Sequence, residues 1–255
     1  MILFDSHAHY DDRRFDRDRD EVLSSLKGAG VRYVANIGSD LPSSRRSVKL
    51  AEQHDFIYAA VGVHPHNADD MVPQDFDELE GLLKHPKVRA LGEIGLDYYR
   101  NLSPKMVQLE RFAQQMELAE KLKVPVVIHE REAAGDCLDI VKQYNIEKGV
   151  FHCYSGSVET AKTLVALGYY LSFTGVVTFG NARRACEVIR WMPRDRLMIE
   201  TDCPYLTPEP FRGKRNDSTK LIYTLNAVAE LLGVTAGEAA EITTRNAMEF
   251  YGIKG

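Results

Sequence analysis

Short apolar runs alternate with longer amphipathic segments along almost the whole chain, and this alternation limits the possible folds more than any other feature. Unbroken apolar runs are typical of strands buried on both faces. Strands are predicted near residues 1–5, 31–37, 56–62, 88–92, 124–128, 148–152, 169–174 and 196–199. Helices are predicted over 17–28, 42–54, 76–84, 106–121, 133–144, 158–168, 182–191, 219–232 and 236–251. This order predicts an α/β fold in which a parallel sheet closes on itself, a (β/α)8 TIM barrel.

The length and the last segments agree with one barrel. The chain has 255 residues, the usual size of a single (β/α)8 domain, and we expect residues 1–255 to form one domain. Gly233 is well placed to end the first of the last two helices. Thr235, with Glu238 three residues later, is expected to begin the second helix with a capping box.

The composition restricts the partners of the chain. The formal net charge is −5 and the isoelectric point is about 5.9, which argues against a broad basic surface that follows duplex nucleic acid. A nucleic-acid end can still bind, because bound metal ions and a local basic patch neutralise phosphate. No apolar stretch approaches the roughly 20 residues that span a bilayer, and no basic leader is present. We therefore expect a cytoplasmic protein with no membrane partner and no obligate protein partner.

The cysteines form no metal-binding or redox motif. Cys137, Cys153, Cys186 and Cys203 are widely separated and include no CxxC pair, so reduced thiols are expected. Cys153 and Cys203 each directly follow a candidate metal ligand. Because neighbouring residues on a strand point to opposite sides, we expect these two thiols to pack behind the site.

Imidazole and carboxylate side chains stand where the predicted strands end. These residues are His7, His9, Glu93, His129, His152 and Asp202. In a (β/α)8 barrel the residues just past the carboxyl ends of the strands converge on one mouth. A lone histidine more often completes a hydrogen-bond network, but a set of this size predicts a metal site at that mouth.

The spacing of these residues favours two ions. His7 and His9 have the same strand parity, so both imidazoles can hold one ion. Asp202 would join them and could also take a proton from bound water. His129 and His152 would serve a second ion. We expect two divalent ions per chain; this ligand mixture suits zinc, manganese, nickel or cobalt and favours magnesium less, and the identity stays open.

Glu93 is the residue that would connect the two ions. Its carboxylate lies in apolar and glycine-rich surroundings, where an unpaired charge is unfavourable and a cation offsets the penalty. The two oxygens of a carboxylate can bridge metals about 4 Å apart. The alternative, an ion pair between Glu93 and Arg131, leaves the other ligand candidates without a role.

Two further histidines are expected at the same mouth. His64 and His66 flank Pro65 just after the third predicted strand. Protonation of a leaving oxygen or contact with a phosphate suits this pair, and we predict a catalytic role for His64 and a substrate-binding role for His66. A turn made rigid by Pro65, with surface histidines, is the alternative.

Basic and aromatic residues near the mouth are candidates for substrate binding. The basic ones are Arg131, just after His129, and Arg212, Lys214 and Arg215 in the loop after the last strand. Anion binding fits this loop. A solvated loop, or for Arg131 a structural ion pair, is the alternative. Tyr98 and Tyr99 follow Glu93 and can stack on a base, although aromatic residues at strand ends more often serve packing.

Taken together, the motifs closely resemble the TatD family of metal-dependent hydrolases within the amidohydrolase-like barrels. The matching segments are Phe4–His9, Val61–His66, Gly92–Tyr98, Val127–Ala133, Phe151–Gly156 and Glu200–Leu206. The resemblance implies that one ion is held by His7, His9, Glu93 and Asp202, and the other by Glu93, His129 and His152. It also implies DNase activity, often a 3′-to-5′ exonuclease acting on ends of single-stranded DNA.

One segment departs from the family pattern. Family members commonly continue the basic loop with Glu-Pro and then a histidine, whereas this chain has Asp217–Tyr223 there, so we expect a substrate loop that differs from that of the family. Hydrolysis of a phosphodiester is the leading hypothesis, because the metal ions would activate water and stabilise charge in the transition state. Hydrolysis of an ester or amide, such as removal of a D-amino acid from tRNA, is the alternative, and a metal-holding scaffold without turnover is a third.

Overall fold

All eight expected strands are present and form one parallel sheet. The structure is a computed structural model that describes residues 1–254. Neighbouring strands are hydrogen-bonded in chain order from the first to the eighth. The strands are β1 (Leu3–Ala8), β2 (Val31–Ile37), β3 (Ile57–Val61), β4 (Val88–Asp97), β5 (Val126–Arg131), β6 (Gly149–Phe151), β7 (Tyr170–Phe173) and β8 (Leu197–Ile199).

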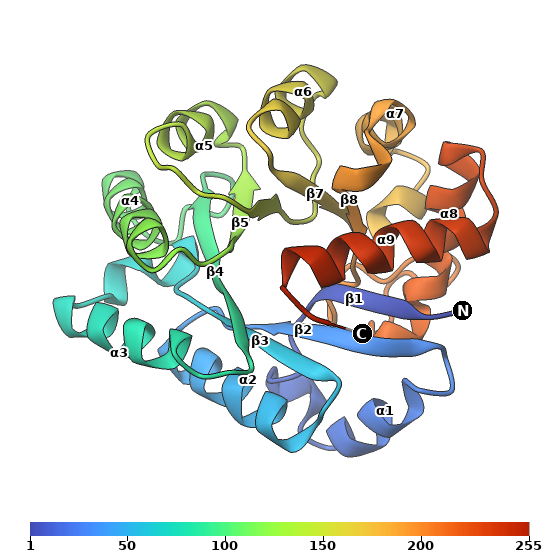
Figure 1. Cartoon of the computed structure of the whole chain (residues 1–255), viewed down its shortest axis with the longest axis horizontal. Coiled ribbons are helices and arrows are strands. Elements are labelled where there is room, and N and C mark those ends of the chain that lie inside the picture. Colours follow the sequence, from blue (N-terminus) through green and yellow to red (C-terminus); the bar gives the residue numbers. More distant parts are fainter. Residues whose placement is uncertain (255) are drawn as a thin grey trace.

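Helices follow the strands and cover the outside of the sheet (Figure 1). They are α1 (Arg19–Ser25), α2 (Leu41–Gln53), α3 (Pro73–Leu83), α4 (Lys105–Leu122), α5 (Ala134–Val141), α6 (Val158–Ala166), α7 (Arg183–Trp191), α8 (Leu221–Leu232) and α9 (Ala236–Phe250). Short 3-10 turns are η1 (Arg13–Phe15), η2 (Pro65–Asp70), η3 (Gly175–Thr178), η4 (Arg194–Arg196) and η5 (Ser218–Lys220). Within residues 1–254, no helix is both long and apolar enough to cross a membrane. The predicted (β/α)8 TIM barrel is confirmed.

The first and last strands come together and nearly close the barrel. Ala8 forms a parallel bridge with Cys203, and the amide of His9 donates to the Cys203 carbonyl at 2.8 Å. Ser6 Oγ donates to the Ile199 carbonyl at 3.0 Å. Because β1 lies beside β8, residues from both ends of the chain meet at one mouth.

Two apolar layers hold the barrel together. The larger joins strand residues to the helices around them. The second joins alternate strand residues to α9 and includes Phe4, Ala35, Ala60, Ala90, Val127, Val150 and Met198, all buried. Several are alanines, as expected where side chains from opposite strands must share a narrow interior.

Helix α9 covers the end of the barrel where the strands begin (Figure 1). Thr244 Oγ1 donates to the Ile2 carbonyl at 3.0 Å, and Asn246 Nδ2 donates to the Leu197 carbonyl at 2.8 Å. Phe250 and Tyr251 pack into the interior layer. With this end covered, the carboxyl ends of the strands form the mouth that remains for a site.

The cap predictions for the last two helices are confirmed. Gly233 ends α8 in the left-handed conformation, with φ of 65°. Thr235 Oγ1 accepts the Glu238 amide at 3.2 Å, and Glu238 Oε2 accepts the Thr235 amide at 2.8 Å, which completes the capping box. Helix α8 begins at Leu221 rather than residue 219, because the turn η5 precedes it.

Strand β4 is longer than predicted. The predicted strand ended at residue 92, whereas β4 continues to Asp97 and pairs Gly95 with His129 of β5. The polar Glu93 interrupts the apolar pattern, so the pattern placed the end too early. Glu93 therefore lies inside a strand, and its neighbours on both sides are held in the sheet.

Candidate metal centre

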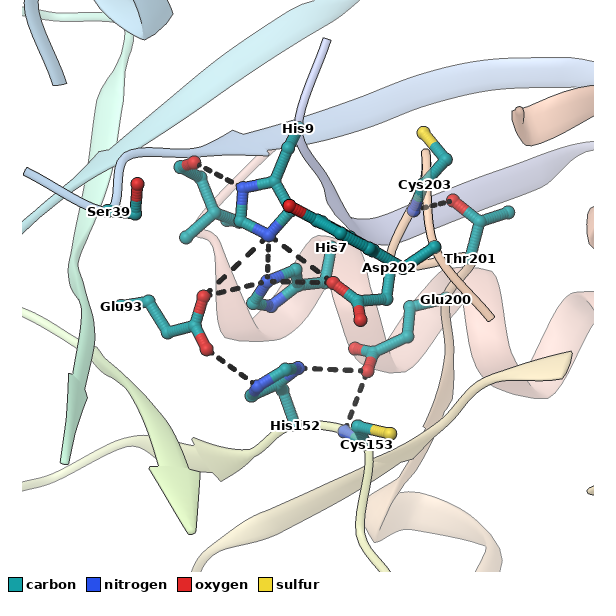
Figure 2. Close-up of polar contacts among 12 residues, drawn as sticks. His7, His9, Ser39, Glu93, His152, Cys153, Glu200, Thr201, Asp202 and Cys203 are labelled. Carbon is teal, nitrogen blue, oxygen red and sulfur yellow. Dashed lines mark hydrogen bonds and ion pairs between the residues drawn. The ribbon is translucent and has the colours of Figure 1, made fainter. Parts of the chain in front are cut away.

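Two histidines from the end of β1 meet one carboxylate from the segment after β8. The Nε2 atoms of His7 and His9 are 3.1 Å apart. Asp202 Oδ1 lies 3.3 Å from His9 Nε2 and 3.8 Å from His7 Nε2 (Figure 2). The parity of the His-x-His motif and the closure of the barrel thus bring together three side chains that could hold one metal ion.

Glu93 faces this group with one carboxylate oxygen and a second group with the other. Its Oε2 lies 3.4 Å from His7 Nε2 and 3.7 Å from His9 Nε2. Its Oε1 lies 2.8 Å from both His129 Nδ1 and His152 Nε2. Each oxygen of one buried carboxylate therefore points at a different pair of imidazoles.

His64 joins the second group more closely than the sequence suggested. Its Nε2 lies 3.3 Å from Glu93 Oε1. Ligand atoms of His64, Glu93 and His129 lie within 4.8 Å of one another, close enough to share an ion, as do those of His7, His9 and Asp202. His64 is thus within reach of a metal as well as of a substrate.

Two glycines of β4 permit the close approach that puts Glu93 in place. A Cβ on Gly92 would lie 2.6 Å from the Cβ of Val127. A Cβ on Gly95 would lie 2.0 Å from the carbonyl oxygen of His129, and Gly95 has φ of 138°. Neither position accommodates a side chain, because both strands need the space for their own backbone.

Two buried acids that were not predicted from the sequence contact the far sides of the His129 and His152 rings. Asp97 Oδ2 lies 3.2 Å from His129 Nε2. Glu200 Oε1 lies 3.3 Å from His152 Nδ1 and accepts the Cys153 amide at 2.7 Å (Figure 2). A carboxylate behind a metal-binding histidine fixes the orientation of its ring. An acid directly after an apolar strand was the available signal, since the same pattern singled out Glu93.

The backbone also fixes one imidazole. His9 Nδ1 lies 2.8 Å from the carbonyl oxygen of Ile37 on β2, which leaves Nε2 turned toward the cluster. The four thiols are free, as expected. Cys203 is fully buried, and Cys153 Sγ contacts Thr174 Oγ1 at 3.5 Å.

The segment that departs from the family pattern is anchored next to β1. Ser218 Oγ donates to the buried Asp5 Oδ2 at 2.6 Å, and Thr201 Oγ1 donates to the same oxygen at 2.6 Å. Asn216 Nδ2 donates to the Thr201 carbonyl at 3.0 Å. This segment therefore differs in sequence from the family pattern, but hydrogen bonds hold it against Asp5 and Thr201, next to Asp202.

The basic residues after β8 differ in their freedom to bind a substrate. Arg215 donates two hydrogen bonds to Asp18, at 2.8 and 2.5 Å, and one to the Arg14 carbonyl at 2.6 Å. Within residues 1–254, Arg212 and Lys214 form no ion pair with a carboxylate. Arg215 therefore ties the loop to the start of α1, and the other two remain available to an anion.

The remaining candidates divide between buried and exposed positions. His66 Nε2 lies 2.9 Å from Asp97 Oδ2, so this ring contacts the acid that supports His129. Tyr98 donates to Asp136 Oδ2 at 2.6 Å and is engaged within the protein. Tyr99 is 55% exposed, with Arg131 stacked on its ring.

The charges in the cluster depend on one another. Burial raises the pKa of Glu93, but the imidazoles of His152 and His64 outweigh it and hold that pKa well below its usual range. Burial lowers the pKa of His9, yet Asp202 outweighs it and raises the pKa to about 9. Burial lowers the pKa of His152 as well, but the carboxylate of Glu93 outweighs this effect and raises the pKa of His152 well above its ordinary value. In the metal-free protein these two rings therefore carry protons at neutral pH.

Metal binding near pH 7 is expected to release protons, because a ring nitrogen must lose its proton before it binds a metal. His9 and His152 are the rings that supply them. Calorimetric titration of the metal-free protein with zinc or manganese, in buffers of different ionisation heat, measures the number released. The apparent affinity should rise as the pH approaches 9, the pKa of His9. Heats that do not depend on the buffer would contradict the protonated cluster.

The donor set fits divalent metal ions. Imidazole nitrogens and carboxylate oxygens converge without a cysteine, which matches borderline ions such as zinc, manganese, nickel and cobalt. A buried carboxylate among several imidazoles is itself difficult to accommodate unless cations or protons balance the charge. The side chains present are therefore suited to hold metal.

Fold and cluster together define a metal-dependent hydrolase whose donors meet at the mouth of a (β/α)8 barrel. Residues 4–252 match the protein family described as TatD related DNase. The chain belongs to the TatD family.

Individual relatives match over nearly their whole length. A Bacillus subtilis protein named "Uncharacterized metal-dependent hydrolase YabD" is 44% identical, covering 99% of this chain and 100% of that protein. An Erwinia tasmaniensis protein named "3'-5' ssDNA/RNA exonuclease TatD" is 33% identical, covering 98% and 100%. The crystal structure of the TatD homologue YjjV from Escherichia coli K12 has a TM-score of 0.94 and 28% identity, covering 99% and 98%.

Proposed function

We propose that this hydrolase uses two metal ions to cleave phosphodiester bonds and shortens single-stranded DNA from its 3′ end. The observation that carries the proposal is the placement of Glu93, whose two carboxylate oxygens face different imidazole pairs. A carboxylate placed in this way can be shared by two ions. In two-metal hydrolytic sites the pair of ions stabilises both the attacking and the leaving oxygen. The relative named as a 3′-5′ exonuclease of single-stranded DNA and RNA supports the class of substrate.

In this proposal the residues divide between two ions. One ion would be held by His7, His9, Asp202 and Glu93, and the other by Glu93, His129 and His152. When bound, the ions supply Lewis acidity toward the phosphate and lower the pKa of the attacking water. Asp97 and Glu200 act as positioning residues, because they contact the ligating rings from behind.

Asp202 is suited to take the proton of the attacking water. Its Oδ1 faces His9, while within residues 1–254 its Oδ2 makes no hydrogen bond. Burial raises the pKa of Asp202, but the hydrogen bond to His9 and the neighbouring imidazoles outweigh it, so the carboxyl is ionised and able to accept a proton.

His64 is suited to donate a hydrogen bond to the reacting phosphate. Burial lowers the pKa of His64 to about 4, so its ring is neutral at pH 7. Its Nδ1 accepts the amide of His66 at 3.1 Å, which places the single ring proton on Nε2. That nitrogen faces Glu93 and therefore points into the cluster. We propose that the strand also contacts four further groups: His66, Arg131, Arg212 and Lys214. Arg215 is proposed to position the loop that carries Arg212 and Lys214.

A nuclease assay with controlled metal content tests the proposal. Protein stripped of metal by a chelator is expected to be inactive and to recover with zinc, manganese, magnesium, nickel or cobalt added singly. With 5′-end-labelled single-stranded DNA, the product should be a ladder that shortens from the 3′ end. The Glu93→Gln variant, purified in parallel, should give no ladder and so excludes a contaminating nuclease.

A mischarged tRNA, offered in the same assay, separates the proposal from its alternative. The activated water could also attack the carbonyl of an aminoacyl ester. Release of a D-amino acid from tRNA, with single-stranded DNA left intact under every metal, would overturn the nuclease proposal and favour deacylation.

A further inference from the structure

Two exposed tyrosines at the mouth each carry an arginine on the ring. The guanidinium carbon of Arg131 lies 3.9 Å from the ring centroid of Tyr99, and that of Arg14 lies 4.0 Å from the ring centroid of Tyr205. Tyr99 is 55% exposed and Tyr205 is 47% exposed. An aromatic ring paired with an arginine plane is a surface on which a nucleic-acid base can stack.

Both pairs border the metal centre. Tyr99 and Arg131 continue β4 and β5 beyond Asp97 and His129, and the Tyr98 amide donates to the Arg131 carbonyl at 2.9 Å. The ring of Tyr205 lies 6.4 Å from the ring of His9, and its amide donates to the Asp202 carbonyl at 2.9 Å. The Tyr99–Arg131 pair thus lies close in sequence to Asp97 and His129. The Tyr205–Arg14 pair lies close in sequence to Asp202 and His9.

The pairs lie on opposite sides of the barrel. Tyr99 and Arg131 extend β4 and β5, whereas Tyr205 follows β8, beside β1. Strand order from β1 to β8 places these two edges across from each other, as Figure 1 shows for β4–β5 and β8–β1. The metal centre, which takes side chains from both edges, lies between them.

Resting on the function proposed above, we propose that Tyr99–Arg131 and Tyr205–Arg14 are two nucleotide subsites, one on each side of the metal centre. A base stacks on the flat surface of each pair, and the guanidinium faces the adjoining phosphate. Bases stack on aromatic rings and on arginine planes with little dependence on sequence, which suits an enzyme that moves along a strand.

The two arginines are held differently. Arg14 donates to both oxygens of Asp12, with Nε at 3.0 Å and Nη2 at 2.7 Å, so its plane is fixed over Tyr205. Arg131 forms no hydrogen bond or ion pair through its guanidinium within residues 1–254, so all its donors are available to a phosphate. The subsite at Tyr99 therefore offers more positive charge to the phosphates of the strand. The subsite at Tyr205 offers a more rigid surface for a base.

Binding of a resistant oligonucleotide tests the subsites without turnover. The probe is a short 5′-fluorescein oligothymidylate with phosphorothioate 3′ linkages, titrated by fluorescence anisotropy in manganese. Tyr99→Leu and Tyr205→Leu are each expected to weaken binding by roughly 5- to 100-fold, the range that loss of one stacked base produces. Tyr99→Phe and Tyr205→Phe keep the ring and should bind like the wild type.

Trp191→Leu is the matched control. Trp191 is 36% exposed with Lys162 Nζ 5.8 Å from its ring, but it ends α7 just before β8 begins, at the opposite end of the barrel. Loss of this aromatic–cation pair should leave binding unchanged. Equal weakening by Trp191→Leu would mean that exposed aromatic residues act nonspecifically, and would overturn the subsites.

Abasic probes assign each tyrosine to a position on the strand. Replacing one base at a time by an abasic residue should weaken wild-type binding at two positions. Tyr99→Leu should be insensitive to one of these replacements and Tyr205→Leu to the other, because the stacking partner is already absent. If both variants bind like the wild type while DNA is still cleaved, the subsites are wrong and the nuclease stands. If the variants lose binding but no metal supports cleavage, the subsites stand and the nuclease proposal fails.

Discussion

Replacement of Glu93 by glutamine is expected to abolish detectable hydrolysis, with a loss of at least about 10²–10³-fold in kcat, the effect of deleting one major electrostatic contact at a reacting centre. Glutamine has nearly the same shape but no charge. Five imidazoles within 3.7 Å of the carboxylate would then lose its negative charge: His7, His9, His64, His129 and His152. The amide also offers one oxygen instead of two, so it cannot serve both halves of the cluster.

Elemental analysis after dialysis measures the cause of this loss directly. The wild type should retain two ions per chain and Glu93→Gln one or none, and added metal should raise the melting temperature of the variant less. Glu132→Gln, which removes an exposed carboxylate nearby, is the matched control and should match the wild type. A Glu93→Gln protein that keeps two ions and more than about a tenth of the activity would rule out the bridging role.

Replacement of Gly95 by alanine is expected to destabilise the protein by about 3 kcal/mol or more, since backbone strain and overpacking each contribute about 1–3 kcal/mol. The added Cβ would lie 2.0 Å from the carbonyl oxygen of His129, at a backbone φ of 138° that alanine rarely adopts. Relief requires β4 and β5 to separate. Because Glu93 and His129 lie on these strands, metal affinity should fall together with stability.

Gly135→Ala separates this packing effect from a general effect of glycine replacement. Gly135 is exposed in α5, and a Cβ there meets nothing within 4 Å. Alanine favours a helix over glycine, so stability should change by less than about 1 kcal/mol, in the stabilising direction. Urea denaturation of both variants provides the comparison. Similar midpoints for the two would show that β4 and β5 tolerate a side chain at their contact.

Local patterns explain why most of the fold could be predicted. The unbroken run before His129 predicted β5, and the capping box of Thr235 and Glu238 predicted where α9 begins. Both signals are contained within a few residues, because periodicity and capping depend on neighbours in the chain. The end of β4 was misplaced, since Glu93 is polar for a reason that is not local: it faces histidines of β1, β5 and the segment after β6.

The partners of residues that act through another residue could not be identified from the sequence. Glu200 accepts the Cys153 amide across 47 positions, and Arg215 pairs with Asp18 across 197. No sequence pattern in the basic loop distinguishes Arg215 from Lys214. Arg215 pairs with Asp18, whereas Lys214 forms no ion pair with a carboxylate within residues 1–254. Such pairings arise only when strands and loops from distant segments are packed together.

The sequence by itself determined the alternation of strands and helices, and with it the rule that polar residues at strand ends share one mouth. Only the tertiary structure decided that the two oxygens of Glu93 face separate imidazole pairs, and that Tyr99 and Tyr205 stand on opposite sides of them. The physical reason is distance. Side-chain chemistry and periodicity are properties of neighbours along the chain, whereas a metal centre or a strand-binding surface depends on separations that closure of the barrel sets.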